Sequence, residues 1–285
     1  MNFQKVSLSA GLYFVGVPIG TARDITLRAL DVLASAEVLA AEDTRSLRRL
    51  MDIHGIPLVG RPMIALHDHS GEGVSARLLK AIGDGKSVAY ASEAGMPLIA
   101  DPGFELGRAA GQAGCMITCA PGPSALLTAL VLAGLPTDAF HFAGFLPNAK
   151  AARRAALEAL RDIPGTLVFY ESPKRLAAML ADAGSVLGRE RSGVVCRELT
   201  KKFEEVQRGT LEELAARYEA RSAKGEIVVL IDRNRSETVS EDALKIDLVQ
   251  ALEALSMRDA VDMIAKAHDV PRRQVYQLAL ELSKE

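Results

Sequence analysis

Short apolar runs alternate with helix-like segments along the first half of the chain. Five runs rich in apolar residues predict strands at Leu12–Val17, Val38–Ala41, Met63–Leu66, Val88–Ser92 and Met116–Ala120. Apolar residues recur at helical spacing over Asp24–Ser35, Arg45–Ile53, Val74–Ile82, Glu105–Ala113 and Ser124–Leu132. We expect Asp24 to cap the first of these helices. Such alternation predicts an α/β fold with a parallel sheet covered on both faces.

A second set of elements follows Leu135. Strand patterns lie at Phe140–Phe145, Thr166–Tyr170, Val194–Glu198, Glu205–Arg208 and Ile227–Ile231, and helix patterns at Ala151–Leu160, Lys174–Ala183 and Leu211–Tyr218. Two of these strands flank the short segment Lys201-Lys202-Phe203, which predicts a hairpin. We therefore expect the second sheet to be mixed.

The end of the chain has a different character. Residues 233–241 are polar and are typical of a linker, and the following residues predict three short helices, the last two at Arg258–Ala267 and Arg272–Leu282. We expect two α/β domains, residues 11–135 and 136–235, and a small helical segment at 243–285. The last segment is either a helix-turn-helix-like appendage or a plain helical cap.

Composition narrows the class of protein. The chain has 285 residues, of which 49% are hydrophobic and 25% charged, and no run approaches the roughly 18 apolar residues that span a membrane. The start lacks the pattern of a signal peptide, and the three cysteines are an odd, sparse set, so we expect a cytoplasmic protein without membrane contact. We expect these cysteines to be buried, and His67-Asp68-His69 to be an exposed strand end, so no metal site is predicted.

Charge is distributed unevenly along the chain. The formal net charge is −2, but residues 150–208 carry a net +4 and residues 236–285 a net −4. The net charge of −2 excludes a nucleic-acid-binding protein that is basic over its whole length. A polyanion would meet the middle of the chain, although solvated helix faces explain the same excess.

Three glycine- and proline-rich loops follow predicted strands of the first sheet. They are Gly16-Val17-Pro18-Ile19-Gly20, the stretch ASEAGMPLIADPG at residues 91–103, and Pro121-Gly122-Pro123-Ser124. Ligands of open α/β sheets bind at such strand ends, and glycines let the backbone approach them closely. The first loop lacks the spacing that binds a dinucleotide. Carboxylates such as Glu93 and Asp101 beside apolar residues favour a small ligand that is partly apolar and cationic.

Several motifs in this order resemble those of a known family. They include Leu12–Gly20, Ala41-Glu42-Asp43-Thr44-Arg45, residues 91–103, Pro121–Ala125, Phe142–Pro147, Phe169–Arg175, Arg197–Lys201 and Gly225–Val228. In these motifs the chain resembles the 16S ribosomal RNA 2′-O-ribose methyltransferases, which belong to the tetrapyrrole-methylase superfamily. The resemblance covers roughly residues 11–285.

The resemblance implies a fold, a reaction and a partner. The fold would be two α/β domains of the tetrapyrrole-methylase type, with the cofactor S-adenosylmethionine in the cleft between them. The reaction would be methyl transfer to the ribose 2′-oxygen of a cytidine in the decoding region of 16S rRNA, with the rRNA or the 30S subunit as substrate. The superfamily resemblance also suggests a homodimer.

The resemblance further implies which residues bind the cofactor. They are Val17, Pro18, Glu93, Gly95, Pro97, Leu98, Ile99, Ser124, Ala125, Phe145, Leu199, Glu226, Ile227 and Val228. The chain departs from the family pattern at some of these loops. The family usually has Asp at the position of Glu93, Thr at that of Met96 and Ser at that of Ala100. It usually has Ala-Thr in place of Gly16-Val17.

Candidates for catalysis and RNA binding follow from residue chemistry. Asp43, Glu42, Glu171 and Glu198 are candidates for a base that removes the hydroxyl proton, although each can equally be a helix cap or the partner of a nearby Arg. RNA phosphates can be held by Arg45, Lys174, Arg175 and Lys201, and Tyr170 can stack on a base.

Two other functions stay open at this point. One is C-methylation of a tetrapyrrole, against which the first loop argues because it departs from the Gly-x-Gly-Pro-Gly pattern of those enzymes. The other is a non-enzymatic protein that retains the fold, either a ribosome-assembly factor or a helix-turn-helix nucleic-acid binder. RNA binding without methyl transfer would favour it.

Overall fold

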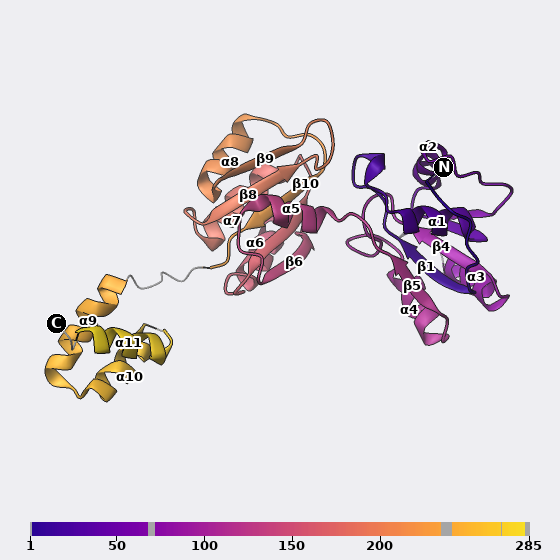
Figure 1. The fold of residues 1–285 in the computed structure, drawn as a ribbon. Coiled ribbons are helices and arrows are strands. Elements are labelled where there is room, and N and C mark those ends of the chain that lie inside the picture. Colours follow the sequence, from indigo (N-terminus) through magenta and orange to yellow (C-terminus); the bar gives the residue numbers. More distant parts are fainter. Residues whose placement is uncertain (1, 68–71, 235–240, 269, 283–285) are drawn as a thin grey trace. The chain divides into compact units, whose positions relative to one another are not determined.

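The computed structural model describes residues 2–67, 72–234, 241–268 and 270–282. Most of the predicted linker, together with Asp68 and His69, lies outside these residues. The chain divides into two compact units, Met1–Asn234 and Arg235–Glu285. The first unit contains two sheets, and the second contains helices (Figure 1).

The first sheet is entirely parallel, as the sequence predicts. Its order is β3-β2-β4-β1-β5, with strands β1 (Gly11–Val15), β2 (Val38–Ala41), β3 (Met63–Ala65), β4 (Ser87–Ala91) and β5 (Ile117–Ala120). The helices around it are α1 (Leu27–Ser35), α2 (Thr44–Ile53), α3 (Glu72–Gly83) and α4 (Phe104–Gln112).

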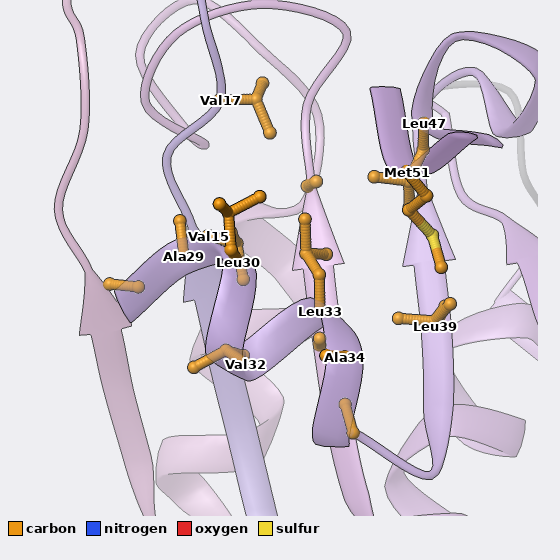
Figure 2. Packing of buried hydrophobic residues seen from close by; sticks show 14 of the residues in the cluster. Val15, Val17, Ala29, Leu30, Val32, Leu33, Ala34, Leu39, Leu47 and Met51 are labelled. Atoms are coloured by element: carbon orange, nitrogen blue, oxygen red, sulfur yellow. The ribbon is translucent and has the colours of Figure 1, made fainter. Parts of the chain in front are cut away.

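Side chains that alternate along the strands serve two separate cores. Tyr13 and Val15 of β1 belong to a core with residues of α1 and α2. Figure 2 shows Val15 close to Leu30 of α1 in this core. Leu12 and Phe14 face α3 and α4 on the other side. The two faces explain why the strand sequences are continuously apolar.

The start of α1 differs from the prediction. Asp24 ends a short 3-10 helix, η1 (Ala22–Asp24), and Thr26 is the residue that caps α1, because its hydroxyl accepts from the Ala29 N–H at 3.2 Å. The hydroxyl of Thr26 also contacts the carbonyl of Pro121 at 3.2 Å. Thr26 therefore links the start of α1 to the third of the predicted loops.

The second sheet is mixed, as predicted. Its order is β6-β7-β10-β8-β9, with β6 (Phe140–Phe145), β7 (Thr166–Glu171), β8 (Ser192–Arg197), β9 (Glu205–Thr210) and β10 (Ile227–Ile231). β6 and β7 are parallel, and β8 and β9 form the predicted antiparallel hairpin. One face is covered by α6 (Lys150–Ala159), α7 (Leu176–Leu187) and α8 (Leu211–Ala220).

The other face of the second sheet is covered by α5 (Ala125–Ala133). Ala129 and Leu130 of this helix pack against Val194, Val228 and Leu230. Figure 1 shows α5 lying against this sheet. The predicted domain boundary lies after α5 in sequence, whereas the side chains of α5 pack with the second sheet. The loop before α5 therefore connects the two sheets directly.

The second unit has a core of its own. Its helices are α9 (Glu241–Ala254), α10 (Met257–Ala267) and α11 (Arg272–Leu282), which agree with the three predicted helices. The core is formed by Leu244, Leu248, Ala260, Val261, Ile264, Val275, Leu278 and Ala279. Ser256 caps α10 through the Asp259 N–H at 3.3 Å.

The cysteines agree with the prediction only in part. Cys196 is buried in β8, and desolvation raises the pKa of its thiol to about 11. Cys115 and Cys119 are half-buried rather than buried. Cys119 lies in β5, the edge strand of the first sheet, and Cys115 lies just before that strand.

Candidate functional site

A cavity of about 250 Å³ lies where loops of the first sheet meet strand ends of the second. Its walls combine apolar and acidic side chains, the combination that a partly apolar cation requires. The lining residues are Ile19, Glu42, Glu93, Ala94, Gly95, Met96, Ile99, Ala100, Asp101, Ser124, Ala125, Phe145, Tyr170, Glu171, Leu199, Glu226, Ile227 and Val228.

The loop after β4 lines this cavity with an unusual backbone conformation. Gly95 has a φ of 74° and forms a two-residue bridge with Val17, in which each N–H donates to the other's carbonyl at 2.9 and 3.1 Å. Leu98 and Ala100 also adopt positive φ, at 71° and 62°. A non-glycine residue in this region costs energy, and such strain concentrates at functional sites. The loop is therefore held in one shape.

The first and third loops approach each other at two glycines. A Cβ on Gly122 would lie 2.9 Å from backbone atoms of Gly16, so neither position accepts a side chain without movement. The Gly122 N–H donates to the sulfur of Met96 at 3.2 Å. Met96 lies where the family usually has Thr, and its sulfur is the hydrogen-bond acceptor that links the second loop to the third.

The second sheet presents aromatic side chains to the cavity. The ring of Tyr170 meets those of Phe142 and Phe145 edge-on, with centroids 4.8 and 5.8 Å apart. Burial raises the pKa of the Tyr170 hydroxyl, which bonds the backbone of Leu126 at the start of α5. Phe145 remains more than half exposed, so its ring is available to a ligand.

A strained loop after β8 closes this side of the cavity. Glu198 and Thr200 adopt positive φ, at 53° and 62°. The Thr21 N–H donates to the hydroxyl of Thr200 at 3.2 Å, which ties the loop to the first sheet's side. Leu199, between Glu198 and Thr200 in sequence, lines the cavity.

Glu171 is the most deeply buried carboxylate of the cavity. Its side chain has no exposed surface, its Oε1 accepts from the Ser172 N–H at 2.7 Å, and the Arg175 Nε lies 3.2 Å from the same oxygen. Its Oε2 has no hydrogen-bond partner among the described residues. Desolvation raises the pKa of this carboxyl despite the nearby Arg175 and Arg153. Glu171 is therefore a buried carboxylate whose pKa lies above that of an ordinary glutamate and whose Oε2 is free to accept a proton.

The other predicted bases have structural partners. Asp43 caps α2 through the Arg45 N–H at 2.8 Å and forms an ion pair with the Arg45 side chain, which lowers its pKa. Glu198 binds Lys201 and the Glu226 N–H, which hold its pKa down. Glu42 lines the cavity, and its Oε2 accepts from the Glu93 N–H at 3.1 Å. Of the four candidates, Glu42 and Glu171 line the cavity, and Asp43 and Glu198 do not.

The predicted RNA-binding cations divide into two pairs. Arg45 and Lys174 are exposed, Arg45 with 91% of its side chain accessible. Arg175 is bound to Asn148, to the carbonyl of Leu146 and to Glu171, and Lys201 to Glu198 and Glu226. The second pair holds the protein together in this structure.

Most of the predicted cofactor residues line the cavity. The exceptions are Val17, Pro18, Pro97 and Leu98. Five further residues line the cavity and were not among the predicted site residues: Ile19, Ala94, Met96, Ala100 and Asp101. Small and aliphatic wall residues carry no chemical signal, so only the position of Ile19 and Ala94 inside the motifs could have identified them.

The described residues lack two kinds of feature. In residues 2–67, 72–234, 241–268 and 270–282, His, Cys, Asp and Glu do not gather in groups of three or more that could hold a metal ion. Within the same ranges no helix is both long enough and apolar enough to cross a membrane.

Comparisons with known proteins agree with this fold. Residues 11–215 match the family model of tetrapyrrole (corrin/porphyrin) methylases, and residues 238–283 match that of the RsmI C-terminal HTH domain. A solved structure of uroporphyrin-III C-methyl transferase from Thermus thermophilus, complexed with S-adenyl homocysteine, superposes with a TM-score of 0.54. It covers 77% of this chain and 96% of its own, at 19% identity.

Closer relatives cover almost the whole chain. Ribosomal RNA small subunit methyltransferase I of Mesorhizobium japonicum is 43% identical over 96% of this chain and 93% of its own. The protein of the same name from Escherichia coli O157:H7 is 41% identical over 95% and 94%. This chain therefore belongs to the ribosomal RNA small subunit methyltransferase I family, within the tetrapyrrole methylases.

Proposed function

We propose that this protein transfers a methyl group from S-adenosylmethionine to the ribose 2′-oxygen of a cytidine in the decoding region of 16S rRNA. Family membership makes it an S-adenosylmethionine-dependent rRNA methyltransferase. The finer statement of base, atom and rRNA region rests on the sequence resemblance. The observation that carries the proposal is the cavity itself, which unites motif residues from both sheets.

The cavity wall fits the cofactor's chemistry. S-adenosylmethionine supplies an activated sulfonium methyl, an aromatic base and an amino-acid group. Glu93, Asp101 and Glu226 place carboxylates at the wall where a cationic group would be stabilised. Ile99, Leu199 and Val228 supply apolar surface, and the backbone of Gly95 is accessible between them. We assign the cofactor to these residues together with Ser124, Ala125, Phe145 and Ile227.

Within this proposal Glu171 is the general base. Its unpartnered Oε2 would accept the proton of the 2′-hydroxyl, and its raised pKa makes the carboxylate a stronger base than an ordinary glutamate. Arg175 and the Ser172 N–H hold the other carboxylate oxygen in place. Glu42 is the second candidate because it also lines the cavity.

The exposed groups around the cavity support an RNA substrate. Arg45 and Lys174 would contact phosphates, and Tyr170 with Phe145 would stack on the nucleotide that enters the cavity. The segment with net charge +4, residues 150–208, contains Tyr170 and Lys174. The small helical unit would dock on the subunit, and deletion of residues 243–285 without any change in subunit binding would exclude that role.

We also propose a cytoplasmic homodimer. The exposed face of α5 carries Leu127 and Val131, with Val131 82% exposed. The edge strand β5 of the first sheet begins at the exposed Ile117, directly after the exposed Met116. Exposed apolar side chains such as these favour a protein partner. Sedimentation equilibrium tests this part, because a monomer at micromolar concentration would contradict it.

The decisive experiment uses 30S subunits from cells that lack this protein. The subunits are incubated with the purified enzyme and methyl-labelled S-adenosylmethionine, and the label is located by nuclease digestion and mass spectrometry. Label on one cytidine ribose of the decoding region supports the proposal. Label on a base, or on a tetrapyrrole acceptor offered in parallel, would replace it. RNA binding with no label on any acceptor would favour the assembly-factor hypothesis.

A further inference from the structure

A second cavity lies beside the loop that follows β8. It has a volume of about 300 Å³ and is lined by Arg197, Glu198, Phe203, Glu205, Tyr218, Arg221, Ser222, Ala223, Lys224 and Gly225. None of these residues except Glu198 belongs to the predicted cofactor, catalytic or RNA sites. The cavity belongs to the second sheet and to α8, whose Tyr218 faces the hairpin of β8 and β9.

The cations of this cavity outweigh its carboxylates. Arg197 and Glu205 form a nearly buried ion pair with Nε and Oε2 2.9 Å apart, and Arg221 shares Glu205 at 3.1 Å. Lys201 binds Glu198 at 2.9 Å and so compensates its charge. Lys224 is exposed and has no ion pair within the described residues. The mouth of the cavity is thus suited to an anion.

Aromatic and hydroxyl groups complete the lining. Phe203 has 63% of its surface exposed, and the ammonium of Lys202 lies 5.5 Å from its ring centroid. Tyr218 is only 6% exposed, yet its hydroxyl has no hydrogen-bond partner in the described part of the chain. A buried hydroxyl without a partner is costly and is explained if a ligand supplies the partner. These features suit a nucleotide: the exposed ring can stack on its base, the cations can bind its phosphate, and the unpartnered hydroxyl can bond to the polar edge of its base.

The two cavities share a wall. Lys201 binds Glu198, which lines the second cavity, and Glu226, which lines the first, at 2.9 and 3.0 Å. Gly225 lies against Glu198 so closely that a Cβ there would meet the carboxylate. Neighbouring nucleotides of one strand could therefore occupy neighbouring cavities.

We propose that the second cavity is a subsite for a nucleotide of the substrate RNA that flanks the methylated ribose. Phe203 stacks on its base, Arg221 and Lys224 bind its phosphate, and the Tyr218 hydroxyl bonds a polar atom of the nucleotide. The inference rests on the proposed function for the identity of the RNA. Such a subsite would place the strand and would take no part in proton transfer.

The test measures binding of a short fluorescein-labelled single-stranded RNA and the steady-state kinetics on 30S subunits. Phe203→Ala should weaken RNA binding by about tenfold, the size of a lost base–aromatic stack. Lys224→Ala should reduce the salt slope of binding by about 1, because it removes one phosphate contact. Tyr218→Phe should weaken binding by about threefold, as expected for one lost hydrogen bond. It should not lower the melting temperature, because the hydroxyl has no partner in the protein.

Matched controls separate this subsite from general effects. Phe140→Ala removes an exposed ring at the opposite end of β6 from Phe145, and Arg189→Ala removes an exposed cation near α8. Both should leave RNA affinity within about twofold of the wild type. In the kinetics, Phe203→Ala should raise KM for the subunit with little change in kcat or in cofactor affinity, the pattern of lost substrate binding.

Two results would overturn the inference. The first is that Phe203→Ala and Lys224→Ala bind RNA as tightly as the two control variants do. The other is a lower kcat at saturating subunit for Phe203→Ala with RNA affinity unchanged, which would make the loop part of the reacting site. Because RNA binding is measured without methyl transfer, failure of the proposed reaction is seen separately, as wild-type enzyme that labels no rRNA.

Discussion

The parallel sheet and the mixed sheet give the first cavity different kinds of surface. The loops of the parallel sheet contribute walls whose backbone is held by the bridge of Val17 to Gly95 and by the approach of Gly16 to Gly122. The mixed sheet contributes side chains at strand ends, above all Tyr170 and Glu171. The first sheet therefore determines the shape of the site, and the second determines much of its chemistry.

This difference leads to distinct expectations for substitutions. In the parallel half, harm should come from added atoms that displace a loop, and should appear in stability and cofactor affinity together. In the mixed half, removal of a functional atom should change the chemical step and leave the fold intact. The comparison between the two halves would fail if a variant of the parallel half changed only the chemical step, or if a variant of the mixed half disrupted the fold.

The largest expected effect is on the chemical step, at Glu171. Glu171→Gln keeps the size of the side chain and an acceptor for the Ser172 N–H, but it removes the base. We expect kcat to fall about 10²- to 10⁴-fold, with cofactor affinity nearly unchanged, measured by single-turnover methylation of 30S subunits. Glu42→Gln is the matched comparison and should lose far less. The reverse order of the two losses would assign the base to Glu42.

The pH dependence tests the same carboxylate by its sign. A base acts only when ionised, and burial raises the pKa of Glu171, so kcat should fall on acidification at a higher pH than for an ordinary carboxylate. A raised pKa in the folded state favours the protonated form. Its contribution to stability is present below the unfolded pKa and is lost as pH rises through the folded pKa. The stability of wild type relative to Glu171→Gln should therefore decline from acid to neutral pH in denaturant titrations.

The next largest effect is on loop packing, at Gly122. The added methyl of Gly122→Ala would lie 2.9 Å from the Gly16 backbone, so the first and third loops must separate. We expect a loss of about 1–3 kcal/mol in the free energy of unfolding. Cofactor affinity should fall by about tenfold or more. Gly83→Ala, where a Cβ meets nothing within 4 Å, is the control. Normal cofactor affinity in Gly122→Ala would show that the glycine contact does not shape the site.

A smaller effect is expected at Asp43, a carboxylate of the parallel half. Asp43→Ala removes the cap of α2 and the ion pair with Arg45, so the melting temperature should fall by a few degrees. The pKa of Asp43 is lowered, so its contribution is present above the unfolded pKa and is lost as pH falls through the folded pKa. The difference in melting temperature between wild type and Asp43→Ala should therefore disappear in acid. A loss of kcat as large as that of Glu171→Gln would make Asp43 catalytic instead.

The sequence predicted the sheets well because their evidence is local. Continuous apolar runs indicated the parallel strands, and the short Lys201–Phe203 segment indicated the hairpin of β8 and β9. Local pattern could not show that α5 packs on the second sheet, because that depends on contacts between distant segments. It also favoured Asp24 over Thr26 as the cap, since both residue types cap helices and only the path of the chain decides.

For the candidate site, the motifs indicated loops more reliably than roles. Glu171 and Asp43 are equivalent as carboxylates in the sequence, and they differ in the structure by burial and by partners. Lys201 and Arg175 read as RNA-binding cations, although both form internal ion pairs. The second cavity takes Arg197, Glu198 and Gly225 from two of the motifs, and its other lining residues lie outside the motifs, so the sequence did not show that they meet in one cavity.

The smallest expected effect concerns Met96, where the chain departs from the family pattern of Thr. The sulfur of Met96 accepts the Gly122 N–H at 3.2 Å, so an acceptor is already present at this position. Met96→Thr exchanges one acceptor for another, and we expect stability within about 0.5 kcal/mol of wild type. Met96→Leu keeps the bulk but leaves the Gly122 N–H without an acceptor, which should cost about 1 kcal/mol more. Chemical denaturation of both variants measures the difference. Equal losses would show that Met96 acts through its bulk, and the third loop would then depend on the close contact of its glycines alone.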